Sequence, residues 1–94
     1  MEFVKITLYI TGTPCSRRVS RYQRLTDYIV RKYPENLGIF DVKRTETSRE
    51  YVKKLAERGI SPRLMAVEYE LADGESGLML YSSFIRWLVE KGEL

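Results

Sequence analysis

The sequence predicts an α/β domain with the element order β-α-β-α-β-β-α. An alternating apolar run, Phe3–Ile10, is followed at once by turn residues and a helix start. Two strand-like runs flank Asp73-Gly74, a pair that favours a hairpin turn. Because a long helix joins the first two strands, we expect them to be parallel with a right-handed crossover. These observations predict a four-stranded mixed sheet in the order 2-1-3-4, with helices on both faces.

The first strand is expected over Phe3–Ile10. Its apolar residues occupy both faces, which is typical of a central strand: Val4, Ile6, Leu8 and Ile10 on one face, Phe3 and Tyr9 on the other.

The first helix is expected from Pro14 to about Tyr33. Gly12 permits a sharp turn before it, and Thr13 is suited to cap it. Pro14 fits the first helical position, and Pro34 blocks continuation of the helix at its other end.

The remaining elements follow the same kinds of signal. A second strand is expected over Leu37–Val42. Thr47-Ser48-Arg49-Glu50 fits a capping box that begins the second helix at Thr47, and Gly59 ends this helix. The hairpin strands are expected over Leu64–Leu71 and Leu78–Tyr81. The last helix is capped by Ser82 or Ser83 and ended by Gly92, and its inward residues are Phe84, Ile85, Leu88 and Val89.

Composition limits the classes of function. The 94 residues suit one domain, 1–94, and the 44% of hydrophobic residues argues against disorder. No apolar run approaches the roughly 20 residues that span a bilayer, and the N-terminal run lacks the features of a signal peptide. With one cysteine and no histidine, an internal disulfide, a histidine metal site and a histidine triad are excluded. We therefore expect a cytoplasmic protein with no membrane contact, and the composition resembles that of thermophile proteins.

The single cysteine, Cys15, falls in the first turn of the predicted first helix. There the helix dipole and the neighbouring Arg17 and Arg18 favour the thiolate, so Cys15 is a candidate nucleophile. The competing interpretation is a small residue that a helix start tolerates, without chemistry.

Several segments together resemble the glutaredoxin branch of the thioredoxin fold. Thr13-Pro14-Cys15-Ser16 falls on the Cys-Pro-x-Cys tetrad of that family, directly after a similar strand, Leu8–Gly12. Gly59–Pro62 is similar to the segment that holds the family's cis-proline, and Leu78–Leu88 to its last strand and helix. The resemblance implies a thioredoxin-like fold, a cis Ser61–Pro62 bond, and packing of Pro62 against the Thr13–Ser16 loop.

The departures from this family concern its chemistry. Thr13 stands in place of the nucleophilic cysteine and Ser16 in place of the resolving one, so the active site is degenerate and dithiol chemistry is lost. A second alignment makes Cys15 the nucleophile of a monothiol glutaredoxin. The first alignment places Val19 and Tyr22 at core-facing positions; the second would place Arg21 and Arg24 there.

A more distant likeness joins the chain to the KaiB family of circadian clock proteins, which are thioredoxin-like and lack redox cysteines. Leu8–Gly12, Thr13–Ser16 and Ser61–Leu64 carry this likeness. The spacing after Gly12 is one residue shorter in this chain. The likeness supports the first alignment and implies a thioredoxin fold used for binding proteins.

The leading functional hypothesis is a binding domain that needs no cofactor. Its groove would bind a protein partner or a small anion, and its residues are Thr13, Pro14, Ser16, Arg17, Arg18, Ser61 and Pro62. The alternative is a monothiol oxidoreductase in which Cys15 attacks a mixed disulfide and an arginine orients glutathione. A third hypothesis, binding of nucleic acid by the basic first helix, is the least favoured, because no aromatic-interleaved basic motif accompanies that helix.

Overall fold

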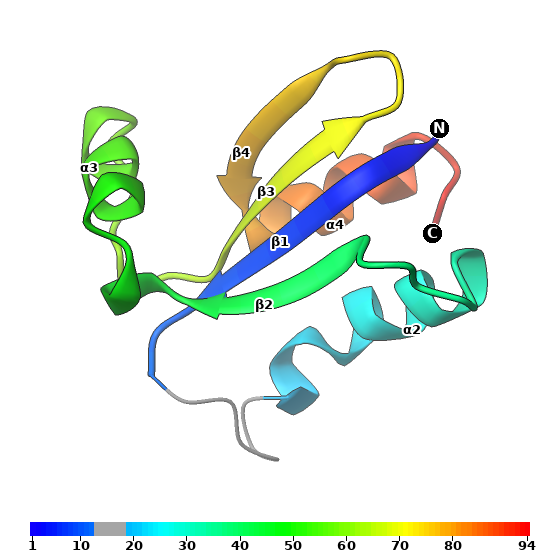
Figure 1. Cartoon of the computed structure of the whole chain (residues 1–94), viewed down its shortest axis with the longest axis horizontal. Helices are drawn as coiled ribbons and strands as arrows, with labels where there is room; N and C mark the ends of the chain where they lie inside the picture. Colours follow the sequence, from blue (N-terminus) through cyan, green and yellow to red (C-terminus); the bar gives the residue numbers. More distant parts are fainter. Residues whose placement is uncertain (13–18) are drawn as a thin grey trace.

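The computed structural model of the chain describes residues 1–12 and 19–94. Their sheet has the order β2-β1-β3-β4 (Figure 1). The strands are β1 (Phe3–Ile10), β2 (Phe40–Arg44), β3 (Ala66–Leu71) and β4 (Ser76–Leu80). β1 pairs with β2 in parallel, and the pairs β1–β3 and β3–β4 are antiparallel. The predicted α/β class, strand order and strand directions are confirmed.

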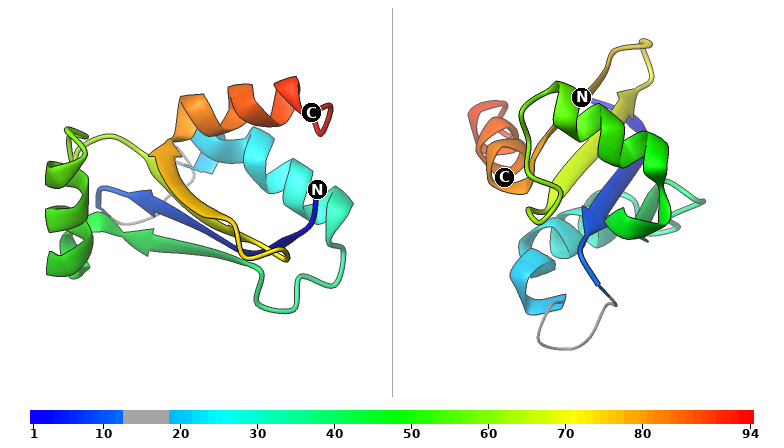
Figure 2. Two further views of the ribbon diagram at one scale, coloured as in Figure 1. Left: turned by 90° about the horizontal axis from the view of Figure 1, so that it is seen from above. Right: turned by 90° about the vertical axis from the view of Figure 1, so that its left-hand side faces the viewer.

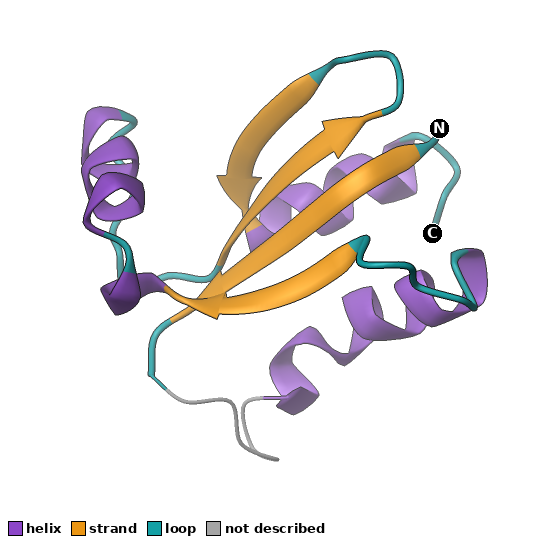
Figure 3. Ribbon diagram, viewed as in Figure 1, coloured by secondary structure: helices purple, strands orange, loops and turns teal. Residues whose placement is uncertain are grey.

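The helices pack unequally on the two faces of this sheet (Figure 3). The 3₁₀ turn η1 (Ser20–Tyr22) continues into α2 (Gln23–Lys32), and the 3₁₀ turn η2 (Thr45–Thr47) precedes α3 (Arg49–Glu57). α2 and α4 (Tyr81–Glu90) cover one face, whereas α3 stands at one end of the sheet (Figure 2). The side chains of α3 pack on the other face, so both faces meet helices, but the described part of the chain leaves most of this second face open.

Two hydrophobic clusters hold these layers together. The main core lies between the sheet and the pair α2 and α4, and its largest fully buried side chains include Tyr28, Phe3, Phe84, Ile6 and Leu8. The second cluster fixes α3 to the opposite face and consists of Tyr9, Tyr51, Leu55, Ala66 and Leu78.

The alternation expected along β1 is wrong at its first residues. Phe3 faces the main core and is 1% exposed, whereas Val4 is 47% exposed. The pairing of β1 with β3 shifts register between Phe3 and Lys5. Such an irregularity adds a residue to one strand and exchanges the faces of the residues before it.

The second strand begins later than expected. Leu37 is 83% exposed and lies in the loop before β2. This loop contains Asn36 and Gly38 with positive φ, and the Asn36 carboxamide oxygen accepts a hydrogen bond from the Phe40 N–H at 3.1 Å. The turn therefore occupies the residues up to Ile39, and the strand continues to Arg44.

Two expected helix caps are displaced, by one residue in α3 and by two or three residues in α4. Ser48, not Thr47, is the N-cap of α3, and its hydroxyl accepts from the Tyr51 N–H at 3.2 Å. α4 begins at Tyr81, and its N-cap residue is Leu80, whose apolar side chain cannot accept a hydrogen bond. The Tyr81 N–H donates to the carbonyl of Met65, just before β3, at 3.0 Å. Val89, expected to face inward on α4, is 44% exposed.

Candidate functional site

Most of the predicted site lies outside the described residues. This applies to Thr13, Pro14, Cys15, Ser16, Arg17 and Arg18. The two chain segments beside this stretch are described: Thr11 and Gly12 follow β1, and Val19 precedes η1. Their surroundings therefore define the candidate site.

The segment with Pro62 lies beside the end of β1. The Thr11 hydroxyl donates a hydrogen bond to the Pro62 carbonyl at 3.1 Å. This contact brings Ser61 and Pro62 next to a residue only two positions before Thr13. Both Ser61 and Pro62 are exposed.

The expected cis bond between Ser61 and Pro62 is wrong, because this peptide bond is trans. The Leu64 N–H donates to the Ser61 carbonyl at 3.2 Å, which closes a turn, and the Arg63 N–H donates to the Ser61 hydroxyl oxygen at 3.3 Å. Pro62 is the second residue of this turn, a position for which the fixed φ of a trans proline is well suited. Pro62 thus shapes a turn rather than a cis-proline groove.

Glu46 is a residue of this region that the sequence interpretation missed. Its carboxylate accepts a hydrogen bond from the Gly12 N–H at 2.7 Å and from the Arg44 guanidinium at 3.1 Å. The Gly12 hydrogen bond is the main cause that lowers the pKa of Glu46 from its ordinary value. A signal existed in the sequence: Gly12 and Glu46 each follow one of two parallel strands, whose carboxyl ends meet at one edge of the sheet.

Two pockets flank the contact between Thr11 and the Pro62 turn, and both are lined by Thr11 and Arg63. The first, of about 190 Å³, adds Arg21 from η1, with Ile10 and Met65 as apolar walls. Among the described residues, neither Arg21 nor Arg63 forms an ion pair. Two cationic side chains from separate elements therefore line one small hollow.

The second pocket, of about 290 Å³, lies on the α3 side. Its walls include Val52 and Pro62, and Thr45 and Glu46 contribute polar groups. Thr45 is 2% exposed, and its hydroxyl oxygen has no hydrogen-bond partner in the described structure. A buried hydroxyl without a partner is costly. The Thr45 hydroxyl is therefore a polar group of this wall whose hydrogen-bonding capacity is unused in the described structure.

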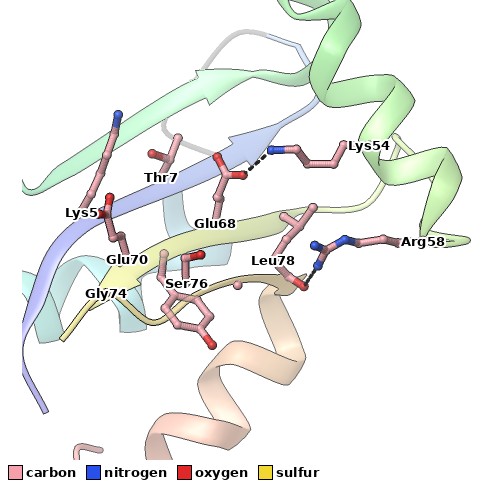
Figure 4. Close-up of a pocket in the computed structure, with 11 residues that line it drawn as sticks. Lys5, Thr7, Lys54, Arg58, Glu68, Glu70, Gly74, Ser76 and Leu78 are labelled. Carbon is pink, nitrogen blue, oxygen red and sulfur yellow. Dashed lines mark hydrogen bonds and ion pairs between the residues drawn. The ribbon is translucent and has the colours of Figure 1, made fainter. Parts of the chain in front are cut away.

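A larger hollow of about 480 Å³ lies on the open face of the sheet (Figure 4). Lys54 of α3 forms an ion pair with Glu68 of β3 at 3.0 Å, and the Tyr9 hydroxyl donates to the same carboxylate at 3.4 Å. Arg58, just beyond α3, reaches over the sheet and donates to the Leu78 carbonyl at 3.3 Å. Charges of both signs line this hollow, which gives it no dominant sign.

Two stacked tyrosines lie where α3 packs on the open face of the sheet. The rings of Tyr9 and Tyr51 lie 3.4 Å apart between centroids, with 12° between their planes. Burial, and then the Glu68 carboxylate, raises the pKa of Tyr9 to about 12. Tyr9 is therefore neutral and holds Glu68 in place rather than acting as an acid or base near neutral pH.

Comparisons with family models, with curated proteins and with solved structures gave no match. In the two described stretches, no group of three or more histidine, cysteine, aspartate or glutamate residues is arranged to hold a metal ion. Their helices are all too short or too polar to cross a membrane. The fold, an α/β domain with a four-stranded mixed sheet, is thus the class that the structure defines.

Proposed function

We propose that this chain is a binding domain that recognises an anionic group at the carboxyl end of β1. The thioredoxin-like class, and the loss of dithiol chemistry that the resemblance implies, are parts of the same proposal. The observation that carries the proposal is the pocket shared by Arg21 and Arg63. Two guanidinium groups without a described acidic partner favour a carboxylate or a phosphate, with which arginine forms charge-assisted and often bidentate hydrogen bonds.

The charges around the pocket support this assignment. Glu46, which lines the neighbouring pocket together with Arg63, is already engaged by the Gly12 N–H and by Arg44. It does not neutralise Arg21 or Arg63 by an ion pair within the described residues. Thr11 lines the same wall, but its hydroxyl proton is already donated to the Pro62 carbonyl, so the donors available to an anion are the two guanidinium groups.

The packing of the first helical segment supports a binding function over a redox function. Tyr22 is buried and Val19 packs against the main core, whereas Arg21 and Arg24 are exposed. This arrangement favours the alignment that leaves both cysteine positions of the family's tetrad without a thiol. The trans Ser61–Pro62 bond removes the cis-proline feature from the proposal, which now depends on the arginines.

The proposal is tested by isothermal titration calorimetry with inorganic pyrophosphate and, in a second arm, with a short peptide that carries several glutamates. Arg21→Ala and Arg63→Ala are each expected to weaken binding of the preferred probe by about tenfold or more, because each removes a charged hydrogen bond. Arg86→Ala, an exposed arginine on α4, is the matched control. An equal loss in Arg86→Ala, or no binding of either probe, would contradict the anion site.

The competing redox hypothesis is tested with the same protein. We expect negligible reduction of insulin disulfides and weak reduction of glutathione mixed disulfides, because dithiol reduction needs a second cysteine and the chain has one. Robust glutathione-dependent turnover that disappears in Cys15→Ser would establish the monothiol function and displace the binding proposal.

A further inference from the structure

β4 is an edge strand with little of the protection that edge strands usually carry. It lies at the border of the sheet beyond β3, and no helix formed by residues 1–12 and 19–94 runs along its outer side (Figures 1 and 2). Its residues, Ser76–Leu80, include no charged side chain and no proline, and its pairing with β3 has no bulge. Charged side chains, prolines and bulges are the features by which natural sheets prevent the addition of another strand.

The hydrogen bonds at both ends of β4 show which of its backbone groups face outward. The Leu71 N–H donates to the Glu75 carbonyl at 2.7 Å, and the Tyr81 N–H donates to the Met65 carbonyl at 3.0 Å. Because these groups alternate along an antiparallel strand, the odd-numbered residues of β4 face β3. The backbone groups of Ser76, Leu78 and Leu80 therefore point away from the sheet.

One side chain covers this outer edge. The Arg58 guanidinium donates to the outward Leu78 carbonyl at 3.3 Å (Figure 4). No other described side chain forms a hydrogen bond to the outward groups of β4. Arg58 is exposed, so its side chain is free to leave the Leu78 carbonyl. Its guanidinium has several N–H groups that can donate to a stronger acceptor.

The opposite edge of the sheet is protected differently. β2 carries Asp41, Lys43 and Arg44 along its length. At its two ends, the Asn36 side chain accepts from the Phe40 N–H at 3.1 Å, and the Thr47 hydroxyl donates to the Arg44 carbonyl at 2.8 Å. The contrast between the two edges indicates that β4 is the edge open to pairing.

We propose that β4 binds an extended segment of a partner protein as a fifth strand, and that this segment alternates apolar with acidic residues. An added strand would form hydrogen bonds with the outward backbone groups of Ser76 and Leu78. Its side chains on the open face would meet Arg58, and a carboxylate is the acceptor that the guanidinium prefers to the Leu78 carbonyl. The side chains of the added strand on the other face would extend the main core next to Met79.

A second copy of this chain fits the edge less well. Leu78 is the middle residue of β4, so twofold pairing of two β4 strands about Leu78 would bring two Arg58 side chains together. Two like charges at the centre of an interface oppose its formation. Lys54 and Glu68 on this face pair with each other, whereas Arg58 forms no ion pair within the described residues. The guanidinium at the β4 edge therefore favours an acidic segment from another protein.

The experiment uses synthetic peptides of about seven residues, long enough to span β4 at about 3.3 Å per residue. One peptide alternates valine with glutamate, and its matched control alternates valine with lysine. Binding is followed by NMR titration and by amide hydrogen exchange of the protein. The glutamate peptide is expected to bind at least about tenfold more tightly than the lysine peptide and to protect the Leu78 amide from exchange.

Two further variants separate strand addition from simple charge attraction. A glutamate peptide that is N-methylated on alternate residues keeps its charge but loses the N–H groups that pair with β4, so its binding should be lost. Arg58→Ala should reduce the preference for glutamate over lysine by about tenfold or more, while Arg86→Ala should leave that preference unchanged.

The proposal is wrong if the N-methylated peptide binds as well as its parent, or if Arg58→Ala keeps the full preference. It is also wrong if the Leu78 amide becomes protected merely at higher protein concentration, since a second copy then occupies the edge.

Discussion

At the scale of single residues, Gly77 shows how closely β4 approaches the main core. It pairs directly with Tyr69 of β3, and a Cβ at position 77 would lie 2.7 Å from the Tyr69 hydroxyl oxygen and 2.8 Å from its ring. The ring cannot move aside freely, because it lies 4.9 Å from Trp87 and 5.8 Å from Phe84 between centroids. We expect Gly77→Ala to lower the free energy of unfolding by about 1–3 kcal/mol, measured by urea denaturation.

The controls for this prediction are on the same strand pair. Ser76→Ala, an exposed position next to Gly77, should change the free energy of unfolding by less than about 0.5 kcal/mol. In a Tyr69→Leu background, which removes the ring, Gly77→Ala should cost less than in the natural sequence. Equal costs in the two backgrounds would show that the contact with Tyr69 is not the reason for glycine at position 77.

At the scale of elements, α3 is capped by Ser48 and not by Thr47, the residue that the capping-box pattern predicts. Ser48 accepts the hydrogen bond of the Tyr51 N–H, whereas Thr47 donates its hydroxyl to the Arg44 carbonyl. We expect Ser48→Ala to lower the free energy of unfolding by about 1 kcal/mol, and Thr47→Ala to lower it by less. Denaturation followed by Trp87 fluorescence measures both. A larger loss of unfolding free energy in Thr47→Ala than in Ser48→Ala would show that Thr47 is the cap of α3.

At the scale of the whole molecule, Glu93 joins the end of the chain to α2. Its carboxylate accepts from the Tyr28 hydroxyl at 2.9 Å and forms an ion pair with Lys32, which also donates to the Met1 carbonyl. The Lys32 hydrogen bond is the main cause that lowers the pKa of Glu93 from its ordinary value. Through Lys32, α2 thus contacts both Met1, just before β1, and Glu93, just after α4.

The sign of the resulting pH dependence follows from the lowered pKa of Glu93. A carboxyl whose pKa is lower in the folded state adds stability above its unfolded pKa, and this stability disappears as the pH falls through the folded pKa. Glu93→Gln should therefore lower the free energy of unfolding by about 1 kcal/mol at pH 7 and by progressively less below the unfolded pKa of about 4.3. Glu90→Gln, at an exposed position of α4, is the control. A Glu93→Gln difference that is independent of pH would contradict the assigned ion pair.

The candidate site was predictable only in outline. The pattern that follows Phe3–Ile10 predicts a site at the carboxyl end of β1, and the contact between Thr11 and Pro62 lies there. The family resemblance implies a cis proline, whereas a turn with a trans proline occupies its place. Arg63 and Glu46 were missed, because their relevance depends on which loops meet beyond the strand ends and not on any local motif.

Local signals in the sequence are enough to predict the order of elements, the parallel strand pair and the hairpin. These features depend on short-range signals: alternation along β1, the length of the helical connection, and the Asp73-Gly74 turn. Packing between distant segments sets the features that these local signals do not predict. The irregularity near Val4 set which face Phe3 occupies, and the small cluster around Tyr51 and Leu55 placed α3 over one end of the sheet. Such choices depend on packing between residues far apart in the chain, and the local pattern of a segment does not contain its partners.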